Sequence, residues 1–291
     1  MSRVRRPPEG ATGAATAPEG AGGAGAWTTF PATRGEPIDD AGGLAALVNA
    51  HPLARERALE LVRRGTLSLV GQLSWGSNAT LLGVLEDDQA SAHAIYKPRR
   101  GERPLWDFPS GTLCQREVAA YAVSEAMGWS LVPPTALRNG PFGRGMVQLY
   151  VAHDPDVHFL ALDRPDPGVV ARLVAFDHVI NNADRKSGHV LQAGDGRLWA
   201  IDHGVAFHVE PKLRTVIWSL AGEPLPRDVA AGIEQLLAEL GAAESTLSIH
   251  LDGLLAPGER AALARRVRQL LDDGIFPAPA ADRRHMPWPP V

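Results

Sequence analysis

Residues 181–204 read NNADRKSGHVLQAGDGRLWAIDHG and place two aspartates, Asp184 and Asp202, near the two ends of one short segment. Between them, the strand-like runs HVLQA and LWAID flank the turn residues Gly194-Asp195-Gly196, which predicts a β-hairpin. His189 follows the first aspartate closely. The role of a hairpin with a carboxylate near each end has to be inferred from the other segments of the chain.

The composition favours a globular protein with no nucleic-acid partner and no membrane span. Of the 291 residues, 45% are hydrophobic and 21% are charged, enough for a sizeable core. The net charge of −4 gives no basic surface for nucleic acid, and no run of roughly 18 apolar residues could span a bilayer. The single cysteine, Cys114, excludes an internal disulfide, and the N-terminus lacks the apolar region of a signal peptide. We therefore expect a cytoplasmic protein.

Turn signals and periodic segments divide the chain into four parts. Residues 1–40 are rich in Gly, Ala and Pro and are expected to be disordered. Residues 41–152 form a lobe of strands with a leading helix, residues 153–276 a mainly helical lobe, and residues 277–291 a poorly ordered tail. The expected helices are 52–65, 113–127, 169–182, 227–241 and 258–273, and the expected strands outside the hairpin are 66–73, 79–86, 91–98, 131–139 and 145–152.

The order of these parts is the order found in a protein kinase. A lysine ends the third strand, a glutamate lies in the helix that follows, and two aspartates come after the helix of the second lobe. Phosphoryl transfer needs a cation at the phosphates, a carboxylate that holds the cation, metal ligands and a residue that orients the attacking hydroxyl. We therefore expect an α+β, two-lobed, protein-kinase-like fold with an antiparallel sheet in the N-lobe and a mainly helical C-lobe.

Three segments resemble a lipid-kinase family more closely than ordinary protein kinases. They are REVAAYAVSEAMGWSLVPPT (116–135), FDHVINNADRKSGHVL (176–191) and LWAIDHGVAF (198–207), and they resemble the helix-to-strand segment, the catalytic loop and the metal loop of type II phosphatidylinositol 4-kinases. The chain is even more similar to an uncharacterised bacterial family described as similar to phosphatidylinositol 3- and 4-kinases. The resemblance covers roughly residues 66–220.

The resemblance assigns ATP-binding roles to Lys97 and Glu117. Lys97 in AIYKP matches the lysine that binds the ATP phosphates, and Glu117 in QREVAAY matches the helix glutamate that pairs with it. The plainer alternatives are a surface lysine at a strand end and a solvated helix charge. The chain has only three lysines among its 29 basic residues, which favours a specific role for Lys97.

The resemblance also implies weaker nucleotide contacts. Gly76, Ser77 and Asn78 match a short phosphate-binding turn, although an ordinary hairpin turn has the same composition. The hinge that would bind adenine through its backbone matches the stretch that contains Gln148, Tyr150 and Val151.

The two aspartates of the hairpin take the catalytic and metal-binding roles. Asp184 and Arg185 in ADRKSGH are the catalytic candidates, and Asp184 matches the catalytic aspartate that orients the attacking hydroxyl. Asp202 in IDHG matches the aspartate that holds Mg²⁺ or Mn²⁺. The alternative is a capped loop and an ordinary turn.

His189 breaks the kinase pattern. Kinases place a metal-binding Asn at this position, and imidazole prefers softer ions than Mg²⁺. We expect His189 either to bind the metal, with protonation competing near pH 6.5, or to cap the hairpin while Asp202 alone holds the metal. A zinc site is a further alternative, which would use His178, His189, His203 and His208.

The function we predict is ATP-dependent phosphoryl transfer to a hydroxyl on a lipid, a protein or a small molecule. Lys212 and Arg214, opposed by Glu210, are thin support for an anionic lipid. Two alternatives stay open: a nucleotide-binding pseudokinase, which His189 favours, and a kinase-fold transferase that moves AMP.

Overall fold

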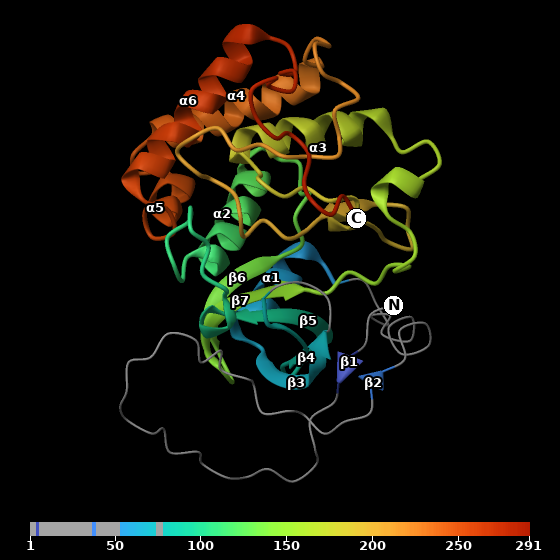
Figure 1. Cartoon of the computed structure of the whole chain (residues 1–291). Coiled ribbons are helices and arrows are strands. Elements are labelled where there is room, and N and C mark those ends of the chain that lie inside the picture. Colours follow the sequence, from blue (N-terminus) through green and yellow to red (C-terminus); the bar gives the residue numbers. More distant parts are fainter. Residues whose placement is uncertain (1–3, 6–36, 39–52, 74–77) are drawn as a thin grey trace.

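The computed structural model describes residues 4–5, 37–38, 53–73 and 78–291. A lobe built on an antiparallel sheet lies below a mainly helical lobe, with helix α2 (Leu113–Ala126) at their junction (Figure 1). This arrangement confirms the α+β, two-lobed architecture expected from the order of the sequence segments.

The N-lobe sheet is antiparallel throughout, with the strand order β2-β1-β3-β4-β5-β7-β6. The expected strand 131–139 starts later than predicted, because Pro133 and Pro134 have no N–H to donate to a neighbouring strand. The five strands predicted from the sequence are β3 (Thr66–Leu73), β4 (Thr80–Glu86), β5 (Ser91–Pro98), β6 (Thr135–Gly140) and β7 (Gly143–Leu149).

Two further short strands lie at the edge of this sheet. β1 (Val4–Arg5) pairs with β3, and β2 (Pro37–Ile38) pairs with β1. The remaining residues of segment 1–40 lie outside the described residues, so their disorder stays a prediction. Gly76 and Ser77, the first two residues of the expected phosphate turn, also lie outside them.

Helix α1 (Arg55–Arg64) covers one face of the sheet. Its buried Leu61 and Val62 pack in one hydrophobic cluster with strand residues such as Tyr96. The guanidinium of Arg138 on β6 donates hydrogen bonds to the carbonyls of Val62 and Gly65 at the C-terminal end of this helix. These bonds satisfy carbonyl groups that a helix end leaves without partners.

Helix α2 is buried on nearly all sides rather than along one stripe. Its residues 113–114 and 116–124 are buried, and its apolar side chains belong to the same core as helices of the C-lobe. The carboxylate of Glu102 accepts hydrogen bonds from the backbone N–H groups of Leu113 and Cys114 and so caps the start of the helix. A helix that lies between two lobes is covered on several sides, so its buried residues do not follow a single amphipathic stripe.

The C-lobe contains the hairpin and four longer helices. Asp166 caps α3 by accepting a hydrogen bond from Val169 N–H. No helix in the described part of the chain combines the length and hydrophobicity needed to cross a bilayer. The N-lobe also contains the 3₁₀ turn η1 (Arg99–Gly101), which follows β5. The C-lobe elements are the 3₁₀ turns η2 (Phe159–Ala161) and η3 (Ser187–His189), the hairpin strands β8 (Val190–Gln192) and β9 (Leu198–Ala200), and the helices α3 (Pro167–Ile180), α4 (Arg227–Gly241), α5 (Thr246–Asp252) and α6 (Pro257–Asp273).

The C-terminal tail is docked, contrary to the expectation that residues 277–291 are poorly ordered. The carbonyl of His285 accepts hydrogen bonds from Thr215 N–H at 3.0 Å and from the Trp218 indole at 3.2 Å. The carbonyl of Pro290 accepts one from Ser187 N–H at 2.8 Å, so the chain end returns to the junction of the lobes (Figure 1). Composition could not reveal this docking, because the partners are loop N–H groups distant in sequence.

We expect removal of residues 285–291 to destabilise the protein. Each hydrogen bond of this kind contributes about 0.5–1.5 kcal/mol, so the loss of three should lower the free energy of unfolding by about 1.5–4.5 kcal/mol. Urea denaturation of the full and shortened chains measures the difference. Equal unfolding midpoints would show that the tail does not dock.

Candidate active site

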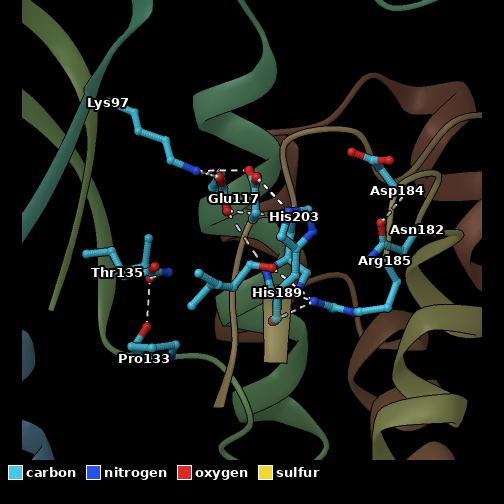
Figure 2. Close-up of polar contacts among 12 residues, drawn as sticks. Lys97, Glu117, Pro133, Thr135, Asn182, Asp184, Arg185, His189 and His203 are labelled. Carbon is cyan, nitrogen blue, oxygen red and sulfur yellow. Dashed lines mark hydrogen bonds and ion pairs between the residues drawn. The ribbon is translucent and has the colours of Figure 1, made fainter. Parts of the chain in front are cut away.

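The ammonium group of Lys97 joins two carboxylates that come from distant parts of the chain. Lys97 lies at the end of β5, and its Nζ lies 2.7 Å from Oε1 of Glu117 on α2 and 2.9 Å from Oδ1 of Asp202 after β9. Figure 2 shows Lys97 reaching from the sheet toward Glu117. The structure therefore forms the ion pair expected between Lys97 and Glu117 and adds Asp202 to it.

Burial and charge act against each other in this cluster. Burial lowers the pKa of Lys97, but Asp202 and Glu117 outweigh it and raise that pKa above its ordinary value. Burial also raises the pKa of Glu117, whose side chain is 2% exposed, although Lys97 opposes this shift. The pKa of Asp202 is lowered, because Lys97 and His189 outweigh its desolvation. The lysine thus stays protonated and holds a charged Asp202 beside it.

Glu117 also fixes the loop that carries Asp202. Its second oxygen, Oε2, accepts a hydrogen bond from the backbone N–H of His203 at 2.8 Å. Asp202 itself has a φ of 61°, a left-handed conformation that side-chain-bearing residues rarely adopt. Such strain typically costs about 1–3 kcal/mol and persists only where surrounding contacts impose it, as at functional sites. Glu117 and Lys97 are two of those contacts.

Arg185 is buried, and its guanidinium binds groups that hold the surrounding loops in place. Its guanidinium is fully buried, lies 2.9 Å from Oδ1 of Asp177 and donates to the carbonyls of His189 and Ile201, both at 3.0 Å. It also contacts Nε2 of His203 at 2.7 Å. The catalytic role that the motif suggested for Arg185 is therefore replaced by a positioning role, which joins the catalytic loop to the loop of Asp202.

Asp184 lies at the edge of this buried network, and its side chain is about a third exposed. Its backbone N–H donates to Oδ1 of Asn182 at 3.0 Å, and Nζ of Lys186 lies 3.3 Å from Oδ2. Figure 2 shows Asp184 and Lys97 on opposite sides of the Glu117–His203 pair. Partial burial raises the pKa of Asp184, although Lys186 opposes the shift. A carboxylate with a raised pKa is a better proton acceptor than an ordinary one.

The imidazole of His189 faces the carboxylate of Asp202 with its Nε2. Its Nε2 lies 3.3 Å from Oδ2 of Asp202, while its Nδ1 accepts a long hydrogen bond of 3.4 Å from Lys186 N–H. These partners assign the proton to Nε2. Burial lowers the pKa of His189 to about 4. The expected competition between protonation of His189 and metal binding near pH 6.5 is therefore absent.

The remaining residues expected at the nucleotide are committed to contacts within the protein. Oδ1 of Asn78 accepts a hydrogen bond from Arg103 N–H at 2.8 Å. The Gln148 side chain is buried and donates to Thr135 Oγ1 at 2.9 Å. The Tyr150 side chain is buried, and the Val151 carbonyl contacts Nδ1 of His153 at 2.8 Å. The side chains of Asn78 and Gln148 thus have hydrogen-bond partners within the protein, and the backbone N–H of Tyr150 also has one, the carbonyl of His93 at 2.9 Å.

The zinc alternative finds no support in the described part of the chain. No group of three or more His, Cys, Asp or Glu side chains lies there in an arrangement that could hold a metal ion. His178 and His203 are instead packed edge-on against Trp218 and Phe176, respectively. These histidines belong to the core around the site.

Two residues of the site escaped the sequence analysis. Asp177 is fully buried on α3 and holds Arg185, and Nδ2 of the buried Asn182 donates to Asp177 Oδ1 at 3.0 Å. A signal was present, because Asp177 interrupts the apolar run VVARLVAFDHVI and a buried charge requires a partner. The identity of that partner, Arg185, became visible only in three dimensions.

The chain is similar in sequence to a mycobacterial protein. Protein Rv2133c of Mycobacterium tuberculosis is 40% identical over 260 residues, which cover 77% of this chain and 92% of the relative. No family model matches the chain.

Several solved structures have a similar course of the chain at low sequence identity. The Helicobacter pylori proinflammatory kinase CtkA is 11% identical, with a TM-score of 0.46 over 74% of this chain and 94% of that one. Hydra Fam20 is 14% identical, with a TM-score of 0.44 over 75% and 87%, and the Golgi casein kinase with Mn/ADP bound is 14% identical, with a TM-score of 0.44 over 75% and 74%.

Arg185 and Asp184 should respond differently to substitution. Arg185→Gln leaves the buried Asp177 carboxylate without its cation, a change that typically costs about 3–5 kcal/mol of unfolding free energy. Asp184→Asn, at a partly exposed site, should cost less than about 1 kcal/mol. Denaturant unfolding of both variants measures the contrast, and a stable Arg185→Gln protein would contradict the positioning role.

Proposed function

This chain belongs to the family of the mycobacterial relative described above, and we propose that it is an ATP-dependent phosphotransferase of the phosphatidylinositol 3- and 4-kinase-like class. The observation that carries the proposal is the contact of Lys97 with both Glu117 and Asp202. A lysine from the sheet, a glutamate from the following helix and an aspartate after a hairpin are the parts that position and neutralise transferring phosphates.

In this proposal Lys97 binds the phosphates of ATP. An ammonium group has three protons, and Glu117 and Asp202 receive two of them, which leaves one for a phosphate oxygen. Glu117 keeps the ammonium in place because its carboxylate is buried and held at both oxygens. The gain is electrostatic, since a fixed cation stabilises the charge on the transferring group without having to reorganise.

In this proposal Asp202 would be the main protein ligand of a hard divalent cation, and phosphate oxygens of ATP would supply further ligands. This carboxylate is 46% exposed and lies within electrostatic reach of Asp184, so it combines access with negative charge. When bound there, Mg²⁺ or Mn²⁺ would screen the negative charge of the phosphates. His189 would orient Asp202 through its Nε2 proton, and Arg185 would hold the backbone on both sides of the hairpin.

Asp184 would accept the proton of the acceptor hydroxyl. The oxygen then forms a bond to the γ-phosphorus of ATP, the bond to the β,γ-bridging oxygen breaks, and ADP leaves. The raised pKa of Asp184 helps it take this proton, and Lys186 keeps its carboxylate oriented at 3.3 Å.

Of the two basic residues expected at an acceptor, only Arg214 remains suited to that role. Lys212 is engaged by Asp107, whose Oδ2 lies 3.0 Å from its Nζ. Burial raises the pKa of Asp184, and the positive charge of Arg214 opposes part of that rise, so the two side chains interact electrostatically. The Nε of Arg214 is buried and has no hydrogen-bond partner among the described residues. An acceptor with a negatively charged group beside its hydroxyl, on a lipid, a protein or a small molecule, suits such a cation.

The experiment that tests the proposal follows the label from ATP. With ATP labelled at the γ-phosphate, the protein should release labelled phosphate to water or to an acceptor, and label at the α-phosphate should remain in ADP. Transfer of the α-label to protein would instead identify an AMP transferase. Asp184→Asn, which should preserve the fold, is the matched control and should lower turnover by about 10²–10⁴-fold.

A pseudokinase is the second candidate, and the pairing of Asp202 favours it. Oδ1 of Asp202 is engaged by Lys97 and Oδ2 by His189, so a metal ion has to compete with both contacts. ATP binding without transfer of either label would establish this alternative.

Lys97→Ala should weaken ATP binding by at least about tenfold, the equivalent of about 1.4 kcal/mol. The reason is the loss of the cation that faces the phosphates. Calorimetric titration of ATP measures the change, with Arg268→Ala, an exposed substitution on α6, as the control. Unchanged affinity in a folded Lys97→Ala protein would refute the assignment.

His189→Asn tests whether the imidazole binds the metal. Since Nε2 carries a proton directed at Asp202, and an Asn amide can donate in the same way, we expect the preference between Mg²⁺ and Mn²⁺ to stay the same. ATP affinity measured with each ion from about pH 5.5 to about pH 8 provides the comparison. A shift toward Mg²⁺ in the variant would show that His189 is a ligand.

A further inference from the structure

A basic pocket lies where the two lobes meet, between helices α1, α2 and α5 and strands β6 and β7. It encloses about 440 Å³, a volume typical of small-molecule sites. None of the residues that carry the proposed phosphoryl transfer lines it. The pocket therefore needs an explanation of its own.

The rim of the pocket is positively charged. Three arginines and a histidine contribute to its lining, and no Asp or Glu belongs to that lining, all of which lies in the described part of the chain. These basic residues are Arg63 and Arg64 at the end of α1, Arg144 on β7 and His250 on α5, and all four are exposed.

The positive charge of this rim is poorly compensated by its surroundings. The carbonyls at the C-terminal end of α1 would normally attract its last arginines, but Arg138 already occupies those of Val62 and Gly65. Arg64 has a carboxylate partner only at 4.0 Å, in Glu60. Burial and the charge of Arg63 lower the pKa of His250, which is consistent with a positive field in the pocket.

The floor of the pocket is apolar and buried. Val118 on α2, Ala136 on β6 and Leu254 after α5 form it, and each is less than a tenth exposed. An inorganic anion would leave this floor uncovered, whereas an apolar molecule without charge would leave the arginines unused. The combination fits a ligand with an apolar body and one anionic group.

We propose that this pocket binds a small phosphomonoester whose apolar body packs on Val118 and Leu254 and whose phosphate is bound by Arg63 and Arg144. Guanidinium groups suit this ligand because their fork of donors matches the oxygens of phosphate. Val118 follows Glu117 directly on α2, so the ligand contacts the helix that holds Lys97.

Phenyl phosphate is a suitable probe, because it carries an apolar ring and one phosphate. We expect it to bind with a dissociation constant of about 1 mM or lower, and at least about tenfold more tightly than inorganic phosphate or phenol. Calorimetric titration of the full-length protein measures all three. Equal affinity for inorganic phosphate, or no binding of phenyl phosphate up to about ten times that concentration, would overturn the proposal.

The site is located by substitutions at exposed positions. Arg63→Gln combined with Arg144→Gln should weaken phenyl phosphate at least about tenfold, whereas Arg268→Gln on α6 should leave it unchanged. Lys97→Ala should also leave it unchanged, which separates this pocket from the proposed ATP site. Undiminished binding in the double variant, with its fold verified by unfolding, or loss of binding in Lys97→Ala, would refute the assignment to this pocket.

Discussion

The buried carboxylate of Glu117 is the constraint on which the site depends. A carboxylate that is 2% exposed pays a large desolvation cost unless it is paired. Here Oε1 receives the ammonium of Lys97 and Oε2 receives the backbone N–H of His203. One residue of α2 therefore fixes a side chain from the sheet and the loop that carries Asp202, and the relative placement of the two lobes decides whether both bonds can form.

Arg116, the residue before Glu117, performs a similar task on the other side of α2. Its guanidinium is buried, pairs with Glu259 on α6, donates to the carbonyl of Ala206 and lies 4.9 Å from the centre of the Phe108 ring. Two adjacent charged residues of α2 thus have partners in different parts of the structure: Glu117 contacts Lys97 and the loop after β9, and Arg116 contacts Glu259 on α6. For this reason the buried residues of α2 are not confined to one stripe. Val118, which follows Glu117 on the same helix, lines the basic pocket.

The site separates groups that hold the structure from groups that could carry chemistry. Asp177 and Arg185 are fully buried and satisfy each other, so they maintain the course of the loops around the hairpin. Asp184 and Asp202 sit on those same loops but keep part of their carboxylates exposed, where a substrate or a metal can reach them. The docked tail adds to this scaffold, since Pro290 binds the N–H of Ser187 three residues after Asp184.

The sequence by itself determined the order of the elements, the two-lobed architecture and the candidates Lys97, Glu117, Asp184 and Asp202. Periodicity, turn residues and the order of the motifs are local properties, and they can be read without knowing what packs against what. Only the tertiary structure decided that Arg185 is a buried partner of Asp177, that Nε2 of His189 lies beside the Asp202 carboxylate, and that residues after 284 dock near the hairpin. These outcomes depend on partners that are distant in the chain, and the free energy of a buried charge or an N–H group is set by such partners and not by its neighbours in sequence.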